Sequence, residues 1–135
     1  MRRQSAKFRK RANEARGFRK ELLDKYKKDG CWICGKSPHK PHRDKPLACS
    51  VLCVHEILNG PLRQKCLDAE HSVLVLCSYC NQEAVTNKGI WPEARQLKLL
   101  LKKNPDGYDL KKHNYMARPN APNRITQQEV DYYDY

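Results

Sequence analysis

The sequence has no long apolar stretch. None of its apolar runs approaches the roughly 20 residues that a helix needs to cross a membrane, so we expect no membrane-spanning segment. The N-terminus, MRRQSAKFRKR, is basic, but no apolar segment follows it, and this argues against a secretory signal. We therefore expect a reducing, cytoplasmic setting. Apolar residues make up 39% of the 135 residues, which allows one small core.

Acidic residues are also scarce. The chain has 15 Asp and Glu against 27 Lys and Arg, a formal net charge of +12. This balance is typical of proteins that bind nucleic acid, because contacts with phosphates release counterions. An acidic membrane surface and a merely solvated basic surface are the alternatives. The excess is greatest in residues 1–28, which hold twelve Lys or Arg and three acidic residues.

Residues 1–28 also show helical periodicity. Apolar side chains recur at steps of three or four, which gives one thin apolar stripe on a basic background. We expect a helix or two, frayed at the start, that dock on the rest of the chain, and the cations of this segment are candidates for contact with nucleic acid. These candidates are Arg9, Lys10, Arg11, Arg16, Arg19 and Lys20.

Seven cysteines are many for such a chain, and four of them form two Cys-x-x-Cys pairs. In a reducing compartment this spacing is more typical of metal binding than of disulfides. Two such turns brought together can offer four thiolates to a tetrahedral Zn²⁺ ion. Gly35, directly after the first pair, helps the backbone to turn. The predicted ligands of a structural zinc are Cys31, Cys34, Cys77 and Cys80.

The other cysteines and two histidines offer alternatives. We interpret Cys49, Cys53 and Cys66 as small apolar residues, while His39 or His42 is the alternative to one cysteine ligand. A redox Cys-x-x-Cys would not need a second copy. A closed four-thiolate site has no open position for chemistry, so it would act by holding the surrounding chain in place.

The hydrophobic pattern predicts strands and helices around the cysteine pairs. Residues 47–57 and 72–76 are apolar and β-branched, as strands are. Residues 81–87 suit a short helix. Residues 91–104 suit a longer one, with Pro92 at its first position and lysines in its last turn.

These elements predict an α+β protein with a small zinc-clamped core and flanking helices. We expect a basic helical segment over residues 1–28, the core with its following helix over 29–104, and an extension over 105–135. Thr126 and Glu129 have the spacing of a capping box, which predicts a short helix near the end of the extension.

Three polar residues lie where the zinc turns would bring the two strands together. His55 and Glu56 end the first strand, and Asn81 directly follows Cys80. Imidazole, carboxylate and amide groups suit a divalent ion and a water. A core position for His55 and an ion pair with Arg63 for Glu56 are the alternatives, and Asn81 suits a helix N-cap. Neighbouring strand side chains point to opposite faces, so His55 and Glu56 share a site only if the strand twists or bulges.

The order of these features resembles the HNH (His-Me finger) endonucleases, and in layout the phage resolvases of the endonuclease VII type. The likeness covers about residues 31–101, and the segments "HEI" and "WP…ARQL" are similar to those of phage proteins described as HNH nucleases. It implies a ββα-metal core, with Mg²⁺ or Mn²⁺ held by His55 and Asn81. It places Glu56 as general base where the family usually has histidine; the other assignment makes His55 the base and Glu56 the ligand.

The resemblance further implies a DNA endonuclease that nicks one strand per site, in the host cytoplasm if a phage encodes it. Arg63 and the basic N-terminal helix would hold the DNA backbone with little sequence specificity, and a homodimer would be required to cut both strands. One alternative is a non-catalytic, zinc-stabilised nucleic-acid-binding module. The other is a scaffold protein that meets a partner through the apolar residues 97–101.

Overall fold

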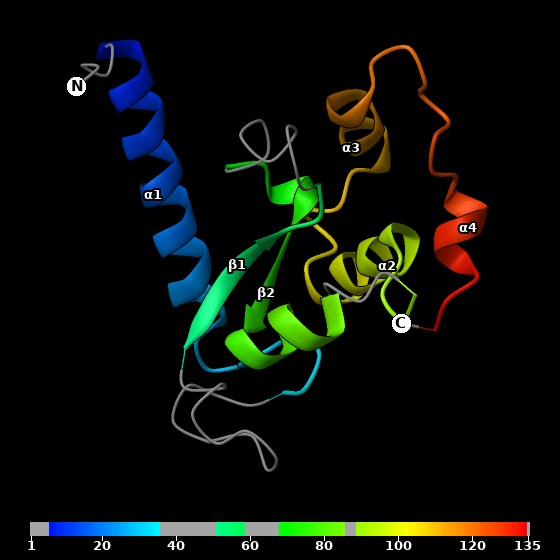
Figure 1. Cartoon of the computed structure of the whole chain (residues 1–135), viewed down its shortest axis with the longest axis horizontal. Coiled ribbons are helices and arrows are strands. Elements are labelled where there is room, and N and C mark those ends of the chain that lie inside the picture. Colours follow the sequence, from blue (N-terminus) through cyan, green and yellow to red (C-terminus); the bar gives the residue numbers. More distant parts are fainter. Residues whose placement is uncertain (1–5, 36–50, 59–67, 86–88, 135) are drawn as a thin grey trace.

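The protein is a small α+β structure, and its computed structural model describes residues 6–35, 51–58, 68–85 and 89–134. Figure 1 shows a two-stranded sheet with helices on both sides of it. No helix within the described ranges is long and apolar enough to cross a membrane. The main elements are α1 (Ala6–Tyr26), β1 (Leu52–Glu56), β2 (Val73–Cys77), α2 (Glu93–Lys103), α3 (Leu110–Ala117) and α4 (Gln127–Asp131).

The sheet is an antiparallel pair with an unbroken register. Leu52 lies opposite Cys77, and the pairing continues residue by residue until Glu56 lies opposite Val73. All five residues of β2 are buried. On the edge of β2 that faces away from β1, the backbone N–H of Trp32 donates to the carbonyl of Val75 at 3.0 Å. The segment after α1 thus pairs with the second edge of the buried strand at Val75.

Two long helices cover the sheet, and both were predicted from periodicity. α1 contacts both strands through its apolar stripe, and α2 contacts β2 (Figure 1). The α2 prediction is confirmed with small differences: Pro92 is the N-cap rather than the first helical residue, while Lys102 and Lys103 occupy the last turn as expected. Leu99 is fully buried, together with Leu97 and Leu100, whereas Leu101 is only partly buried. The buried face of α2 is therefore centred on residues 97–100.

The C-terminal extension is ordered around α2. The capping box predicted from Thr126 and Glu129 is present at the start of α4, and Val130 of that helix is fully buried. α3 was not predicted. Its N-cap is Asp109, whose carboxylate accepts from the backbone N–H of Lys112 at 3.0 Å.

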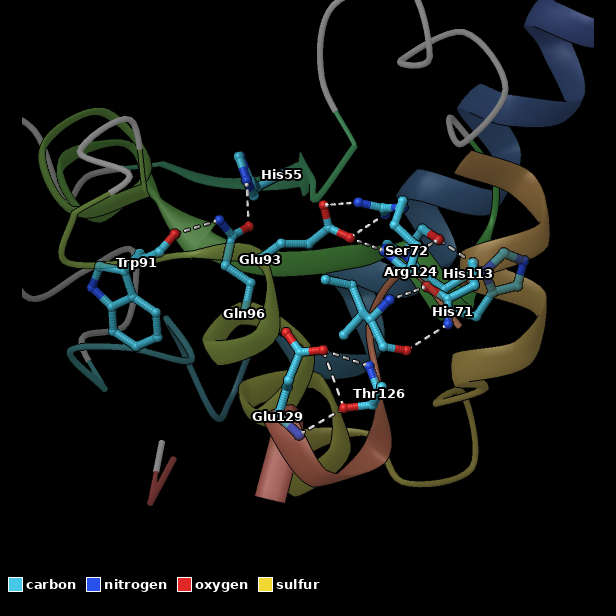
Figure 2. Close-up of polar contacts among 12 residues, drawn as sticks. His55, His71, Ser72, Trp91, Glu93, Gln96, His113, Arg124, Thr126 and Glu129 are labelled. Carbon is cyan, nitrogen blue, oxygen red and sulfur yellow. Dashed lines mark hydrogen bonds and ion pairs between the residues drawn. The ribbon is translucent and has the colours of Figure 1, made fainter. Parts of the chain in front are cut away.

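A chain of polar side chains joins α2, α3 and the segment before α4 (Figure 2). The oxygen of Ser72 lies 2.7 Å from Nδ1 of His113, and Nε2 of His113 donates to Glu93 at 2.9 Å. Arg124 binds both carboxylate oxygens of Glu93. Ser72 and His113 are fully buried. A buried polar group that loses its partner is destabilising, so this network fixes how the extension docks.

Replacing Glu93 with glutamine tests this network by its pH dependence. Burial opposes ionisation of Glu93, but hydrogen bonds from His113 and Arg124 outweigh it and lower the pKa of the carboxyl. A lowered folded-state pKa contributes stability above the ordinary carboxyl value near 4.3, and this contribution is lost as the pH falls through the lowered pKa. We expect Glu93→Gln to cost about 2 kcal/mol at pH 7 and the deficit to shrink in acid. Denaturant unfolding at pH 7 and near pH 4 measures it; a deficit that is the same at both pH values would contradict the assignment.

Candidate metal centre and the His55 face of the hairpin

The four predicted zinc ligands come together. The four side-chain sulfurs all lie within 4.8 Å of one another; they belong to Cys31, Cys34, Cys77 and Cys80. The sulfurs of Cys34 and Cys77 are 3.8 Å apart. A tetrahedral zinc with bonds of about 2.3 Å places its sulfurs about 3.8 Å apart. The cluster is therefore compatible with structural zinc.

Two turns of the backbone present these sulfurs. Gly35 has a φ of 71°, a conformation that favours glycine, and its N–H donates to the carbonyl of Cys31 at 2.8 Å. In the second turn, the N–H of Cys80 donates to the sulfur of Cys77 at 3.4 Å. Each turn thus holds its two thiols on one side of the backbone, as the spacing predicted.

The pKa values within the cluster favour at least one thiolate, which is the form of cysteine that binds a metal cation. A hydrogen bond with Cys80 lowers the pKa of Cys31 to about 5, against the opposing effect of burial. The same hydrogen bond, followed by burial, raises the pKa of Cys80. Cys31 and Cys80 therefore favour a state in which Cys31 is ionised and Cys80 keeps its proton. A metal ion bound here would displace the remaining protons, so its affinity would fall in acid.

The remaining cysteine and histidine predictions are only partly described. Cys53 lies on β1 outside the cluster, where its thiol donates to the carbonyl of Leu76 at 3.3 Å. Burial raises the pKa of Cys53 to about 11, which keeps it a neutral thiol. Its setting fits the predicted role of a small apolar residue. Cys49, Cys66, His39 and His42 lie outside the described residues.

His55 lies on the face of the hairpin that α2 covers. Its Nε2 is 3.1 Å from the side-chain oxygen of Gln96, and it also forms a hydrogen bond with Asn81. Burial lowers the pKa of His55, and these two hydrogen bonds oppose the shift only in part. The imidazole is therefore neutral at pH 7. His55 and Asn81, from two separate segments of the chain, thus lie near each other.

Asn81 owes its position to the second cysteine turn. It lies in a short π-helix, η3 (Cys80–Val85), and not at the N-cap of an α-helix over residues 81–87, because the helical segment begins before it. Its side chain is partly buried. π-helical turns are uncommon and often occur at functional sites. A helix N-cap role, the alternative for Asn81, does not fit this geometry.

Glu56 does not join His55. Because the register is unbroken through both residues, the strand has no bulge here and the two side chains point to opposite faces. Nη1 of Arg19 lies 2.6 Å from the Glu56 carboxylate, and Nη2 donates to the carbonyl of Val54 at 3.0 Å. The ion pair expected as the alternative for Glu56 is thus formed with α1. Arg63, the partner that the sequence suggested, lies outside the described residues.

The other predicted nucleic-acid contacts on α1 face solvent. Arg9, Lys10, Arg16 and Lys20 are exposed, whereas Arg19 is partly buried in its ion pair. The side chain of Arg11 is outside the described part of the helix. Helical spacing places Arg9, Arg16 and Lys20 on one side of α1, away from the buried stripe that contains Leu22.

Gln96 is the residue of this site that the sequence did not indicate. It is buried at 6% exposure, and its amide nitrogen donates to the carbonyl of Trp91 at 2.8 Å (Figure 2). The only signal in the sequence was its place in the segment "WPEARQL", which was interpreted as a helix start.

The fold and the site define a small α+β protein with a four-cysteine cluster suited to a structural metal ion. No protein-family model matches the chain, and no curated protein or solved structure matches it significantly.

Proposed function

We propose that the protein is a metal-dependent endonuclease of the HNH type that nicks DNA. The observation that carries this proposal is the proximity of His55 on β1 to Asn81, which directly follows Cys80 and is close enough to influence the pKa of His55. Their residue types and order are those that the resemblance to the HNH family implies. The zinc-compatible cluster beside them supports it, because it ties η3 to the end of β2.

The donors at this site fit a divalent ion with a partial set of protein ligands. The amide nitrogen of Gln96 faces the carbonyl of Trp91, so its oxygen faces His55 and accepts from Nε2. This leaves Nδ1 of His55 with a lone pair. That nitrogen and the Asn81 amide oxygen would hold Mg²⁺ or, better matched to imidazole, Mn²⁺, once the ion replaces the contact between the two side chains. Phosphate oxygens and waters complete such sites when few protein groups bind the ion.

When bound, such an ion lowers the pKa of water and stabilises charge on the phosphate. The residues of the chain do the rest. Asn81 and His55 would fix the position of the ion. Both side chains are neutral, so the only charges at this point would be those of the ion and the phosphate. Because Arg19 pairs with Glu56 on the opposite face, Glu56 is not proposed as the base. The alternative role of His55, accepting a proton at Nδ1, uses the same lone pair.

The exposed cations of α1 supply a surface for the DNA backbone. Arg9, Arg16 and Lys20 form a row on the solvent side of the helix, and the net charge of +12 attracts phosphates over a longer range. Contacts of this kind carry little sequence information, so we propose low sequence specificity.

The direct test is cleavage of supercoiled plasmid by zinc-loaded protein. We expect conversion to the nicked circle in Mn²⁺, and more slowly in Mg²⁺, with activity falling as salt rises because phosphate contacts weaken. EDTA would remove both the active-site ion and the structural zinc. The control therefore compares zinc-loaded protein with and without added Mn²⁺, and no chelator is used. Intact supercoiled and branched DNA across divalent metals would refute the proposal.

A second function is favoured by the position of Glu56. A relative of the nucleases whose general base no longer faces the site would be a non-catalytic, zinc-stabilised nucleic-acid-binding module. Such a protein would bind DNA with the same salt dependence and leave it uncut. The plasmid assay, combined with a binding measurement under the same conditions, separates the two functions.

A further inference from the structure

Gln96 is a polar side chain within the apolar face of α2. Its neighbours Leu97, Leu99 and Leu100 are fully buried in the core, and Gln96 itself is 6% exposed. Burying an amide without partners is costly. Both ends of this amide are satisfied, one by His55 and the other by the backbone carbonyl of Trp91. The amide thus links the start of α2 to β1.

The Trp91 carbonyl sets the direction of this link. A carbonyl only accepts hydrogen bonds, so the amide nitrogen of Gln96 must face it at 2.8 Å. The amide oxygen is then the group 3.1 Å from Nε2 of His55, and an amide oxygen cannot donate. Nε2 of His55 must therefore carry a hydrogen. In a neutral imidazole the other nitrogen, Nδ1, then has the lone pair.

Trp91 is itself held in place, so the link does not depend on a mobile group. Its side chain is 6% exposed, and the guanidinium of Arg95 lies 4.0 Å from the centre of its ring. Pro92 follows Trp91 and restricts the backbone at this point. Figure 2 shows the three groups in order, from Trp91 through Gln96 to His55.

We infer that Gln96 is a positioning residue, which fixes the ring orientation and tautomer of His55 so that Nδ1 is the nitrogen available to a divalent ion. The inference rests on the proposed function for its purpose, and on the two hydrogen bonds for its geometry. Groups that hold the second nitrogen of a metal-binding histidine typically contribute about 10- to 100-fold to metal affinity.

The test uses zinc-loaded full-length protein with ¹⁵N-labelled histidine. NMR at pH 8 reports the tautomer of His55 without any second metal, and electron paramagnetic resonance reports Mn²⁺ affinity. We expect the wild type to carry hydrogen on Nε2. Gln96→Leu should populate both tautomers and weaken Mn²⁺ binding by about tenfold or more. Gln96→Glu keeps an acceptor for Nε2 but loses the donor to the Trp91 carbonyl, so it should keep the wild-type tautomer while destabilising the link to Trp91.

The controls separate positioning from packing. Gln128→Leu makes the same chemical change on the exposed surface of α4 and should alter neither readout. A Gln96→Leu protein with the wild-type tautomer and Mn²⁺ affinity would overturn the inference, whether or not the wild type cuts DNA. If the tautomer changes as expected but the wild type neither binds Mn²⁺ nor nicks DNA, the positioning role stands and the proposed function fails.

Discussion

Replacing Cys77 with serine is expected to remove bound zinc and unfold the protein. Cys77 is fully buried at the end of β2, and a serine hydroxyl is a poor substitute for a thiolate ligand. Zinc binding to four-ligand sites contributes about 10–16 kcal/mol in small domains, as much as the roughly 5–15 kcal/mol by which whole proteins are stable. Metal analysis should find no zinc, and circular dichroism should show loss of the helical signal.

Cys53→Ser is the matched control for that experiment. Cys53 is also on the hairpin and partly buried, but it lies outside the cluster, and a serine hydroxyl can still donate to the carbonyl of Leu76. We expect this variant to retain zinc and fold. A Cys77→Ser protein that stays folded with a full complement of zinc would refute the four-cysteine assignment.

Replacing His55 with alanine is expected to reduce nicking by about 10²-fold or more while the protein stays folded. His55 is only partly buried, so the loss of stability should come mainly from the buried Gln96 oxygen that is left without its partner, at a cost of about 1–3 kcal/mol. If Nδ1 of His55 binds the ion, Mn²⁺ affinity should fall together with the rate. Loss of nicking at unchanged Mn²⁺ affinity would instead assign His55 the role of proton acceptor.

Glu56→Gln provides the comparison on the same strand. Because Glu56 points to α1, we expect the nicking rate to stay close to that of the wild type, with a loss of about 1–2 kcal/mol of stability as the charge facing Arg19 disappears. A Glu56→Gln protein that folds normally but no longer nicks DNA would restore glutamate as the base and contradict the geometry of the hairpin.

The predictable part of the fold is the part whose signal is local. The α2 helix has apolar residues at helical spacing and lysines at its end, and α4 has its capping box within four residues. The α3 helix lacked such a signal, because its two buried residues, His113 and Asn114, are polar. Their partners lie in other segments, so only the folded chain explains their burial.

The same distinction applies to the candidate site. The cysteine cluster was predictable because each pair is a local turn, and two Cys-x-x-Cys pairs in one small chain are typical of a metal site. Gln96 was not predictable, since its role depends on α2 packing on the His55 face of the hairpin. The sequence could not decide whether β1 has a bulge that would bring His55 and Glu56 to one face. The unbroken register shows that it has none.

The hydrogen bond from Trp32 to Val75 links one edge of the sheet to the proposed zinc site. β2 is the apolar segment VLVLC, and a strand of this kind with a free edge tends to add strands from other molecules and to aggregate. Trp32 lies between Cys31 and Cys34, so the group that covers this edge belongs to the cysteine turn itself. Loss of a bound zinc should therefore expose this edge and favour association between the unfolding molecules, and zinc supply during synthesis would then affect the yield of native protein.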